Sequence, residues 1–146
     1  MMEGRDYNRP RRVKMATVPL IQYKDAPSDV KEIFDDIKRT RNVEDVNNFW
    51  KALANQPETL KRTWEVVRAV MRPGALDEMT KEMIYAAVSI TNNCDYCIHS
   101  HTAGAFNKGM TEPQYQELLA VVATAHMTNA LANGFKIPVD ERFKRE

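Results

Sequence analysis

Prolines and glycines divide the chain into segments whose apolar residues recur at helical spacing. In "APSDVKEIFDDIKRTR", Val30, Ile33, Phe34 and Ile37 fall on one face of a helix, and Ser28 is its expected N-cap. No stretch combines sustained two-residue alternation with hairpin turn residues, so a sheet is not expected. The pattern predicts an all-α fold, a bundle of about six helices joined by short connections.

The same signals place the boundaries of the other helices. A short helix in "VNNFWKALANQ" is expected to end before Pro57, because the residue preceding a proline avoids helical geometry. The next helix begins at Pro57 and stops at Pro73, and another follows in "LDEMTKEMIYAAVSITNN". The segment "CDYCIHSHTAGAFNKG" is expected to form a helix closed by Gly109. The last helix runs from its N-cap Thr111 to Gly134.

The length of 146 residues predicts a single domain over 19–146, preceded by a flexible N-terminal arm over 1–18. An apolar fraction of 43% allows a core that needs no disulfide or metal to support it. The net charge of +1 supplies no strong field that would draw the chain to nucleic acid or a membrane. No apolar run approaches the ~20 residues that span a bilayer, and the N-terminus does not read as a secretory signal. We therefore expect no nucleic-acid partner, no membrane association and a cytoplasmic location.

The last predicted helix is apolar around much of its circumference. A helix of this kind is buried either at the centre of a fold or in a subunit interface, so we expect an oligomer. The apolar residues that surround its axis are Leu118, Leu119, Val121, Val122, Ala125 and Met127.

Both cysteines of the chain, Cys94 and Cys97, stand in "CDYCIHSHTAG". Three residues apart on a helix, their Cα atoms would lie about 5–6 Å from each other, within the range that a disulfide accepts. Asn92 and Asn93 are good N-cap residues, which would put Cys94 in the first helical turn, where the helix dipole favours a thiolate. In the cytoplasm, a close pair of this kind is more often catalytic or metal-binding than structural.

His101 follows Cys97 by four residues, so both side chains point to one helix face. An imidazole in this position can accept the proton of Cys97 or stabilise its thiolate. Glu82, on the preceding helix, is the candidate that would orient the imidazole. His99 is expected at a solvated position.

Two further residues are possible site-lining groups. Tyr96 is expected to pack, and its hydroxyl is an alternative hydrogen-bond donor in the site. His126, alone in the apolar last helix, is expected to be a satisfied buried histidine that could line the same pocket.

The residues alone leave three interpretations of the cysteine pair open: redox chemistry, zinc binding and inert core cysteines. We favour redox chemistry. Two thiolates with His101 or His99 would supply three or four zinc ligands. Structural zinc sites usually take their ligands from two separated knuckles, however, and the chain has no second cysteine pair. We therefore expect no metal and no cofactor other than a redox-active disulfide.

The four residues Glu82, Cys94, Cys97 and His101 resemble the redox signature of the AhpD-like, or carboxymuconolactone decarboxylase, superfamily. That signature is a glutamate, eleven residues, C-x-x-C and a histidine four residues further on, and all of it is in register here. Tyr96 is a frequent choice before the second cysteine. The motif and its flanking helices cover roughly residues 76–134, and "VNNFWKALANQPETL" is similar to the lead-in segment of the family.

The resemblance implies an AhpD-like helical fold, assembled as a trimer or a hexamer, and thiol-dependent reduction of hydroperoxides. Cys97 would attack the peroxide, His101 with Glu82 would relay its proton, and Cys94 would resolve the sulfenic acid to a disulfide. A dithiol such as a dihydrolipoyl group, or a thiol protein, would then reduce the disulfide. The helix dipole alone favours Cys94 as the more acidic thiol, but we follow the resemblance, because Cys97 has the adjacent base.

Three alternatives stay open beside the peroxidase. The first is a disulfide-exchange partner or sensor without strong peroxidase activity. The other two are a zinc-binding module and an enzyme of the carboxymuconolactone decarboxylase type. The decarboxylase is less expected, because members with that activity generally lack this cysteine pair.

Overall fold

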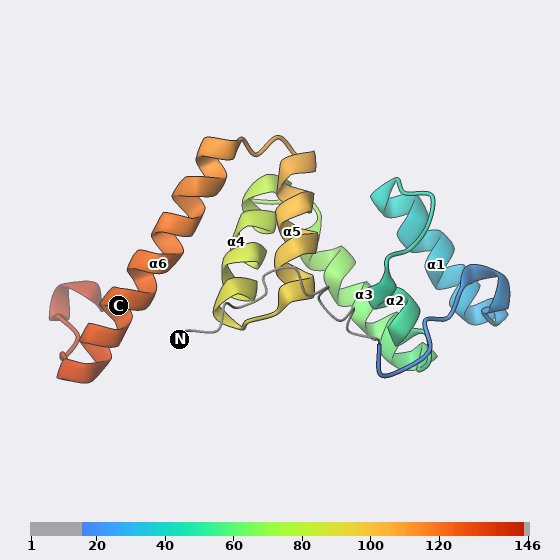
Figure 1. The fold of residues 1–146 in the computed structure, drawn as a ribbon, viewed down its shortest axis with the longest axis horizontal. Coiled ribbons are helices and arrows are strands. Elements are labelled where there is room, and N and C mark those ends of the chain that lie inside the picture. The colour runs from blue at the N-terminus through green and yellow to red at the C-terminus, as the bar shows by residue number, and fades with distance from the viewer. Residues whose placement is uncertain (1–15, 145–146) are drawn as a thin grey trace, which may run out of the picture. The chain divides into compact units, whose positions relative to one another are not determined.

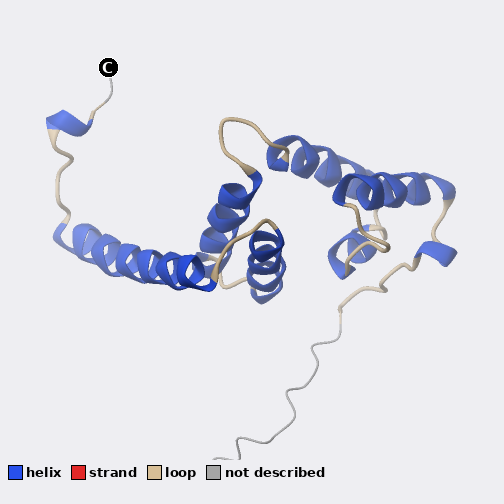
Figure 2. Cartoon of the chain, turned by 90° about the horizontal axis from the view of Figure 1, so that it is seen from above, coloured by secondary structure: helices blue, strands red, loops and turns tan. Residues whose placement is uncertain are grey.

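The computed structural model describes residues 16–144, and every regular element over this range is helical (Figures 1 and 2). The all-α prediction with about six helices is therefore confirmed. The predicted N-terminal arm lies outside the described residues except for 16–18. The elements in chain order are the 3₁₀ turn η1 (Tyr23–Asp25), α1 (Ser28–Arg41), α2 (Asn48–Leu53), α3 (Pro57–Met71), α4 (Glu78–Thr91), α5 (Asp95–Asn107), α6 (Glu112–Phe135) and the 3₁₀ turn η2 (Glu141–Phe143).

The chain divides into two compact units between Val70 and Met71, at the end of α3. The first unit contains α1, α2 and most of α3, and the second contains α4, α5 and α6. The single domain expected over 19–146 stays a prediction. No helix within residues 16–144 combines the length and apolar character needed to cross a bilayer.

The first unit is built around two tryptophans. The rings of Trp50 and Trp64 meet edge to face, with their centroids 5.5 Å apart. The predicted apolar face of α1 packs against them, so that Phe34 and Ile37 are fully buried. The indole N–H of Trp64 donates to the Asp36 carboxylate over 2.7 Å, which satisfies the one polar atom that this ring brings into the core.

The first turn of α1 begins one residue earlier than the sequence predicts. Pro27 occupies the N-cap, with an extended ψ of 165°, and Ser28 is the first helical residue. The carbonyl of Pro27 accepts the N–H of Lys31 over 3.0 Å, as an N-cap carbonyl does. A proline fits this position because its missing N–H has no helical partner to lose.

In the second unit, α4 and α5 lie side by side (Figure 1). A short turn joins them, in which Asn93 adopts a left-handed conformation with φ 53°. At the other end of α5, Gly109 has φ +97° and the N–H of Met110 returns to the carbonyl of Ala105 over 3.0 Å. The predicted closure of this helix at Gly109 is confirmed.

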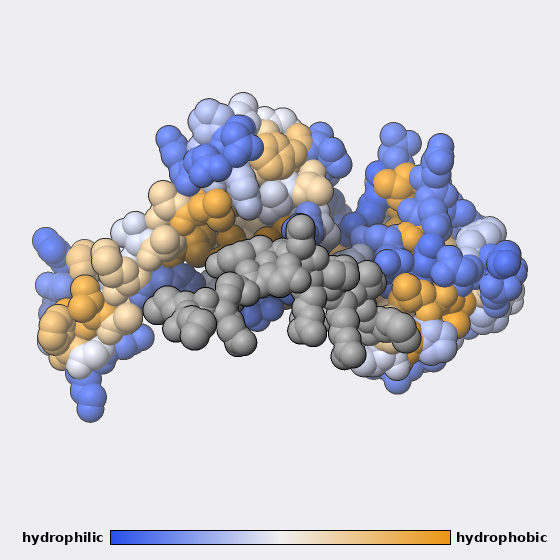
Figure 3. Space-filling model, viewed as in Figure 1, coloured by the Kyte–Doolittle hydropathy of each residue, from blue (hydrophilic) through white to orange (hydrophobic). Residues whose placement is uncertain are grey.

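Helix α6 follows with the predicted N-cap. The hydroxyl of Thr111 accepts the N–H of Gln114 over 3.4 Å, and the Gln114 side chain accepts the N–H of Thr111 over 2.8 Å, which forms a capping box. The helix contacts α4, yet none of its residues is buried in the described chain. Val121 is 65% exposed and Phe135 is 73% exposed, and Figure 3 shows apolar side chains on the surface of this segment.

Candidate redox-active site

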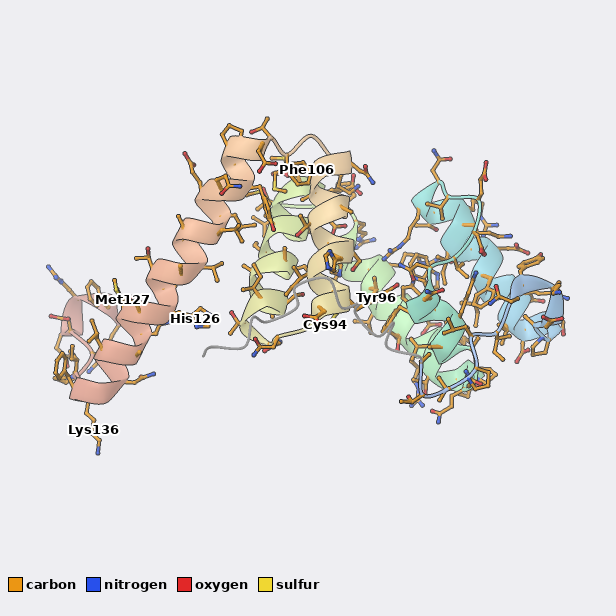
Figure 4. The ribbon with its side chains drawn as sticks, in the orientation of Figure 1. Cys94, Tyr96, Phe106, His126, Met127 and Lys136 are labelled. Carbon is orange, nitrogen blue, oxygen red and sulfur yellow. A yellow bond between two sulfur atoms is a disulfide. The ribbon has the colours of Figure 1, made fainter. Side chains whose placement is uncertain are left out.

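The turn between α4 and α5 places the two cysteines. Cys94 is the N-cap of α5 and Cys97 stands in its first turn, and the two are joined as a disulfide with their Cα atoms 5.3 Å apart. The N–H of Cys97 donates to the sulfur of Cys94 over 3.4 Å. Figure 4 shows Cys94 and Tyr96 at the end of α5 that follows this turn. The helix dipole and the first-turn amides of α5 therefore converge on the cysteine pair.

The predicted role of Asn92 and Asn93 as N-caps is wrong by one residue. Asn92 ends α4, and Asn93 takes the left-handed conformation that reverses the chain direction, which asparagine tolerates better than most residues. The sulfur of Cys94 consequently occupies the capping position itself. A helix can begin at a cysteine in this way because the sulfur is a hydrogen-bond acceptor, although a weak one.

Glu82 and His101 join α4 to α5. Nδ1 of His101 donates to Oε2 of Glu82 over 2.6 Å, and each side chain is only 15% exposed. The structure thus brings together the two residues that the sequence pairs at a distance of 19 positions. Because Nδ1–H is held by the carboxylate, Nε2 is the ring nitrogen that can accept or release a proton in the site.

Gly104 makes this approach of α4 to α5 possible. It follows His101 by three residues on α5, and a Cβ added there would stand 2.9 Å from both Cδ and Oε2 of Glu82. Real Cβ atoms are almost never found so close to another heavy atom, so the carboxylate occupies space that only a glycine leaves open. The sequence signal for this residue is its spacing, one turn beyond the histidine.

Tyr85 is the residue that the sequence analysis missed. Its ring stacks on the imidazole of His101, with centroids 3.6 Å apart and planes at 17°. It follows Glu82 by three residues on α4, so both side chains reach the same face of α5. This i, i+3 relation to the glutamate was visible in the sequence, but nothing in the sequence states that the helices approach each other there.

The three remaining candidate residues are not part of this hydrogen-bonded pair. Tyr96 is 42% exposed at the start of α5, so the expectation that it packs is wrong for the single chain. His99 is exposed, as predicted. His126 is also exposed, so the expectation of a buried histidine is wrong for the single chain. Its Nε2 lies 3.4 Å from the hydroxyl of Thr91 at the end of α4. The side chain lies on the side of α6 that faces α4 (Figure 4), yet this contact leaves it exposed in the single chain.

A cation site would need ligands in addition to the cysteines. Within residues 16–144, no three or more His, Cys, Asp or Glu side chains form a group that could hold a metal ion. With the sulfurs bonded to each other, neither is a thiolate donor. The chemistry that this arrangement supports directly is opening and closing of a disulfide on the same helix as a histidine held by a carboxylate, with Cys97 four residues before His101.

Comparison with known proteins finds a family whose profile covers the helices that carry this site. The sequence profile of the carboxymuconolactone decarboxylase family covers residues 57–140. A crystal structure of the alkylhydroperoxidase AhpD core from Rhodospirillum rubrum ATCC 11170 superposes with a TM-score of 0.86 and 52% sequence identity, over 90% of this chain and 99% of that one. This likeness confirms the AhpD-like fold expected from the sequence.

Two curated relatives carry no described activity. "Uncharacterized protein 4 in cox locus" from Paracoccus denitrificans is 38% identical over 72 residues, which is 44% of this chain and 65% of that protein, slightly less than two thirds of its length. "Uncharacterized protein H16_B0147" from Cupriavidus necator is 32% identical over 84 residues, 57% of this chain and 74% of that protein. The profile match, which spans more than half of the sequence, shows that this chain belongs to the carboxymuconolactone decarboxylase family.

Proposed function

We propose that the protein is a thiol-dependent peroxidase that reduces hydroperoxides through a cycle of the Cys94–Cys97 dithiol and disulfide. The family supports an enzyme of the oxidoreductase or decarboxylase type. The observation that carries the finer proposal is the disulfide in the first turn of α5, on the same helix as a histidine held by a carboxylate. The similarity to the alkylhydroperoxidase AhpD core from Rhodospirillum rubrum supports it as well.

The proposed oxidation begins on the reduced protein. The thiolate of Cys97 attacks the distal oxygen of a hydroperoxide, the O–O bond breaks, and the alkoxide takes a proton to leave as an alcohol. His101, oriented by Glu82, relays this proton after receiving it from the Cys97 thiol. The product on the protein is a sulfenic acid at Cys97.

The cycle closes with the second cysteine. The sulfur of Cys94 attacks the sulfenic sulfur of Cys97, water leaves, and the disulfide forms. A dithiol, either a dihydrolipoyl-type group or a thiol protein, then restores both thiols by supplying two electrons and two protons. The Cα separation of 5.3 Å supports this step, because the disulfide forms within one helical turn.

The assignment of attack to Cys97 needs a direct test, because Cys94 also has a favourable position. As the N-cap, Cys94 accepts the N–H of Cys97, and a thiolate there would gain from the helix dipole. Cys97 is the cysteine four residues from His101, which favours it as the thiol that transfers its proton. In a Cys94→Ser variant, one equivalent of hydroperoxide should leave a sulfenic acid on Cys97 that dimedone labels.

The decisive experiment is turnover of cumene hydroperoxide or tert-butyl hydroperoxide with a dithiol reductant. Mass spectrometry after one equivalent of hydroperoxide should show rapid loss of two thiols and formation of the Cys94–Cys97 bond. Full turnover by a Cys97→Ser variant would contradict the assignment of the nucleophile. A reduced protein with stoichiometric zinc on its thiols would contradict the redox function as a whole.

The second candidate function is disulfide exchange without meaningful peroxide turnover, as a redox partner or sensor. The bonded cysteine pair at the start of a helix favours it equally, since such pairs also exchange with other thiols. A reduction potential in the range of cellular redox buffers, together with negligible hydroperoxide activity, would select this function.

We also propose that the protein is a homo-oligomer, a trimer or a hexamer. The support is α6, which leaves large apolar side chains exposed along most of its length in the single chain. A second copy would cover them, as the apolar pattern of this helix predicts. The cytoplasmic location stays a prediction from the sequence.

A further inference from the structure

We propose that Tyr85 is a positioning residue of the proton relay, which fixes the plane of the His101 imidazole by stacking on its face. The inference rests on the proposed function and adds to it a residue outside the four-residue signature. Its evidence is the parallel contact, with 3.6 Å between centroids and 17° between planes. One turn of α4 therefore holds the imidazole both by its edge, through Glu82, and by its face, through Tyr85.

The two contacts restrict different motions of the ring. A hydrogen bond at Nδ1 restrains one atom of the imidazole but tolerates small rotations of the ring about its Cβ–Cγ bond. A stacked ring opposes that rotation, because rotation would separate the two faces. Nε2 is the atom that must meet the Cys97 thiol and later the leaving oxygen. With both contacts in place, the ring keeps Nε2 pointing in one direction.

The stacked ring of Tyr85 would also stabilise a positive charge on the imidazole of His101. The proposed relay passes through an imidazolium each time His101 takes the cysteine proton, and the face of an aromatic ring attracts a cation. Tyr85 and Glu82 would thus favour the same protonated state of His101 from two directions. Loss of the aromatic face should weaken proton acceptance even where the Glu82 hydrogen bond remains.

The surroundings of Tyr85 allow this role to be separated from a role in folding. The side chain is 39% exposed, so replacing it leaves no large internal cavity. The backbone at this position is held independently of the ring, since Tyr85 lies within α4 and its carbonyl accepts the hydroxyl of the buried Ser89 over 2.7 Å. The ring can be changed while the helix remains.

The test compares Tyr85→Phe, which keeps the stacking ring, with Tyr85→Leu and Tyr85→Met, which do not. In the Cys94→Ser background, the rate of alkylation of Cys97 by iodoacetamide is measured against pH. The profile should move to higher pH in the Leu and Met variants and stay in place in the Phe variant. The ring protons of His101 should be shifted upfield by the Tyr85 ring in the NMR spectrum of the parent and of the Phe variant, and should lose that shift in the other two.

Turnover supplies the third measurement, in the protein with both cysteines. We expect the Leu and Met variants to lose about 10-fold or more in kcat with little change in KM, and Tyr85→Phe to stay within about 2-fold of the parent. Tyr23→Leu is the matched control, because Tyr23 is a tyrosine of nearly equal exposure, 38%, in the other unit. It should change none of the three readouts.

The outcomes separate this inference from the proposed function. If the parent protein does not turn over hydroperoxide, the peroxidase proposal is wrong, but the alkylation profile and the histidine signals still test Tyr85. If Tyr85→Leu or Tyr85→Met folds, loses the upfield shift and yet keeps the parent alkylation profile, the positioning role is overturned. Rescue by Phe alone supports it, because a purely steric role would be met by Leu or Met as well.

Discussion

His101 and Glu82 share a hydrogen bond of 2.6 Å between Nδ1 and Oε2, across the contact between α5 and α4. Both side chains are largely enclosed, so solvent competes little for this bond. The carboxylate fixes which nitrogen of the imidazole carries its proton, and it places a negative charge beside a ring that must become positive if it accepts a proton from a thiol. The proposed relay depends on that charge as well as on the geometry.

Replacing Glu82 by Gln tests the charge with little change of shape. Gln can still accept the Nδ1–H through its amide oxygen, but it does not stabilise an imidazolium. We expect hydroperoxide turnover to fall about 10- to 100-fold, a part of the 10²–10⁴ that a positioned acid–base group typically contributes. The alkylation of Cys97 should slow in parallel at neutral pH.

Glu78→Gln is the matched control for this variant. Glu78 lies one turn earlier on α4, and its carboxylate pairs with Lys108 over 3.0 Å in a partly exposed ion pair. A surface pair of this kind contributes little, so turnover and alkylation should match the parent. Equal behaviour of the Glu82 and Glu78 variants would remove Glu82 from the relay.

Gly104→Ala tests the space that the carboxylate occupies. A methyl group there would stand 2.9 Å from Cδ and Oε2 of Glu82, so either the carboxylate or the helix must move. We expect a loss of about 1–3 kcal/mol in the free energy of unfolding, as for other overpacking changes, together with a large fall in turnover. Denaturant unfolding and the peroxide assay measure the two effects.

Gly134→Ala separates overpacking from the general effect of adding a methyl group to a helical glycine. A Cβ at Gly134, in α6, would have no heavy atom within 4 Å apart from its chain neighbours and the nearby backbone of its own helix. Alanine should therefore raise the free energy of unfolding by about 0.5–1 kcal/mol, because it has the higher helix propensity. A Gly104→Ala variant as stable and active as this control would mean that the contact with Glu82 can relax without cost.

Local signals explain which parts of the fold could be predicted. Pro57, Gly109 and Thr111 each act on backbone geometry within their own turn, and the helix boundaries that they predict are present in the structure. The N-terminus of α5 was misplaced because a cysteine can cap a helix, while Asn93 serves the chain reversal instead. The choice between neighbouring polar residues is made by the turn geometry and not by their separate propensities.

The site could be predicted as far as spacing along one helix allows. Cys97 and His101 follow from an i, i+4 relation on α5. Glu82 was a candidate partner from its place on the preceding helix, and the resemblance to the family signature supported it. The contacts of Tyr85 and Gly104 depend on how α4 meets α5, which a periodic pattern does not specify. The exposure of His126 was misjudged for a related reason, because an apolar helix does not reveal whether its own chain or a neighbouring one covers it.

Asp36→Asn should reveal how the first unit responds to acid. The indole N–H of Trp64 holds the pKa of the Asp36 carboxyl below its usual value near 3.8, with further help from Arg39 and Arg68. A carboxyl whose pKa is lowered by folding stabilises the folded state above its unfolded pKa, and this contribution is lost as the pH falls through the folded pKa. Thermal unfolding should show the variant less stable than the parent at pH 7, and the difference should shrink as the pH falls below 3.8 and through the lowered pKa of Asp36. A constant difference over this range would mean that the charge of Asp36 does not contribute.

Val121→Glu tests whether another copy of the chain covers α6. Val121 is 65% exposed in the single chain, so a carboxylate there would meet water in a monomer but would be buried in an apolar interface. We expect light scattering after size exclusion to show dissociation or a strongly weakened assembly. Asn129→Glu adds the same charge to a polar position of the same helix and should leave the assembly closer to the parent. A variant at Val121 with the mass and thermal stability of the parent would show that this part of α6 faces solvent in the assembled protein.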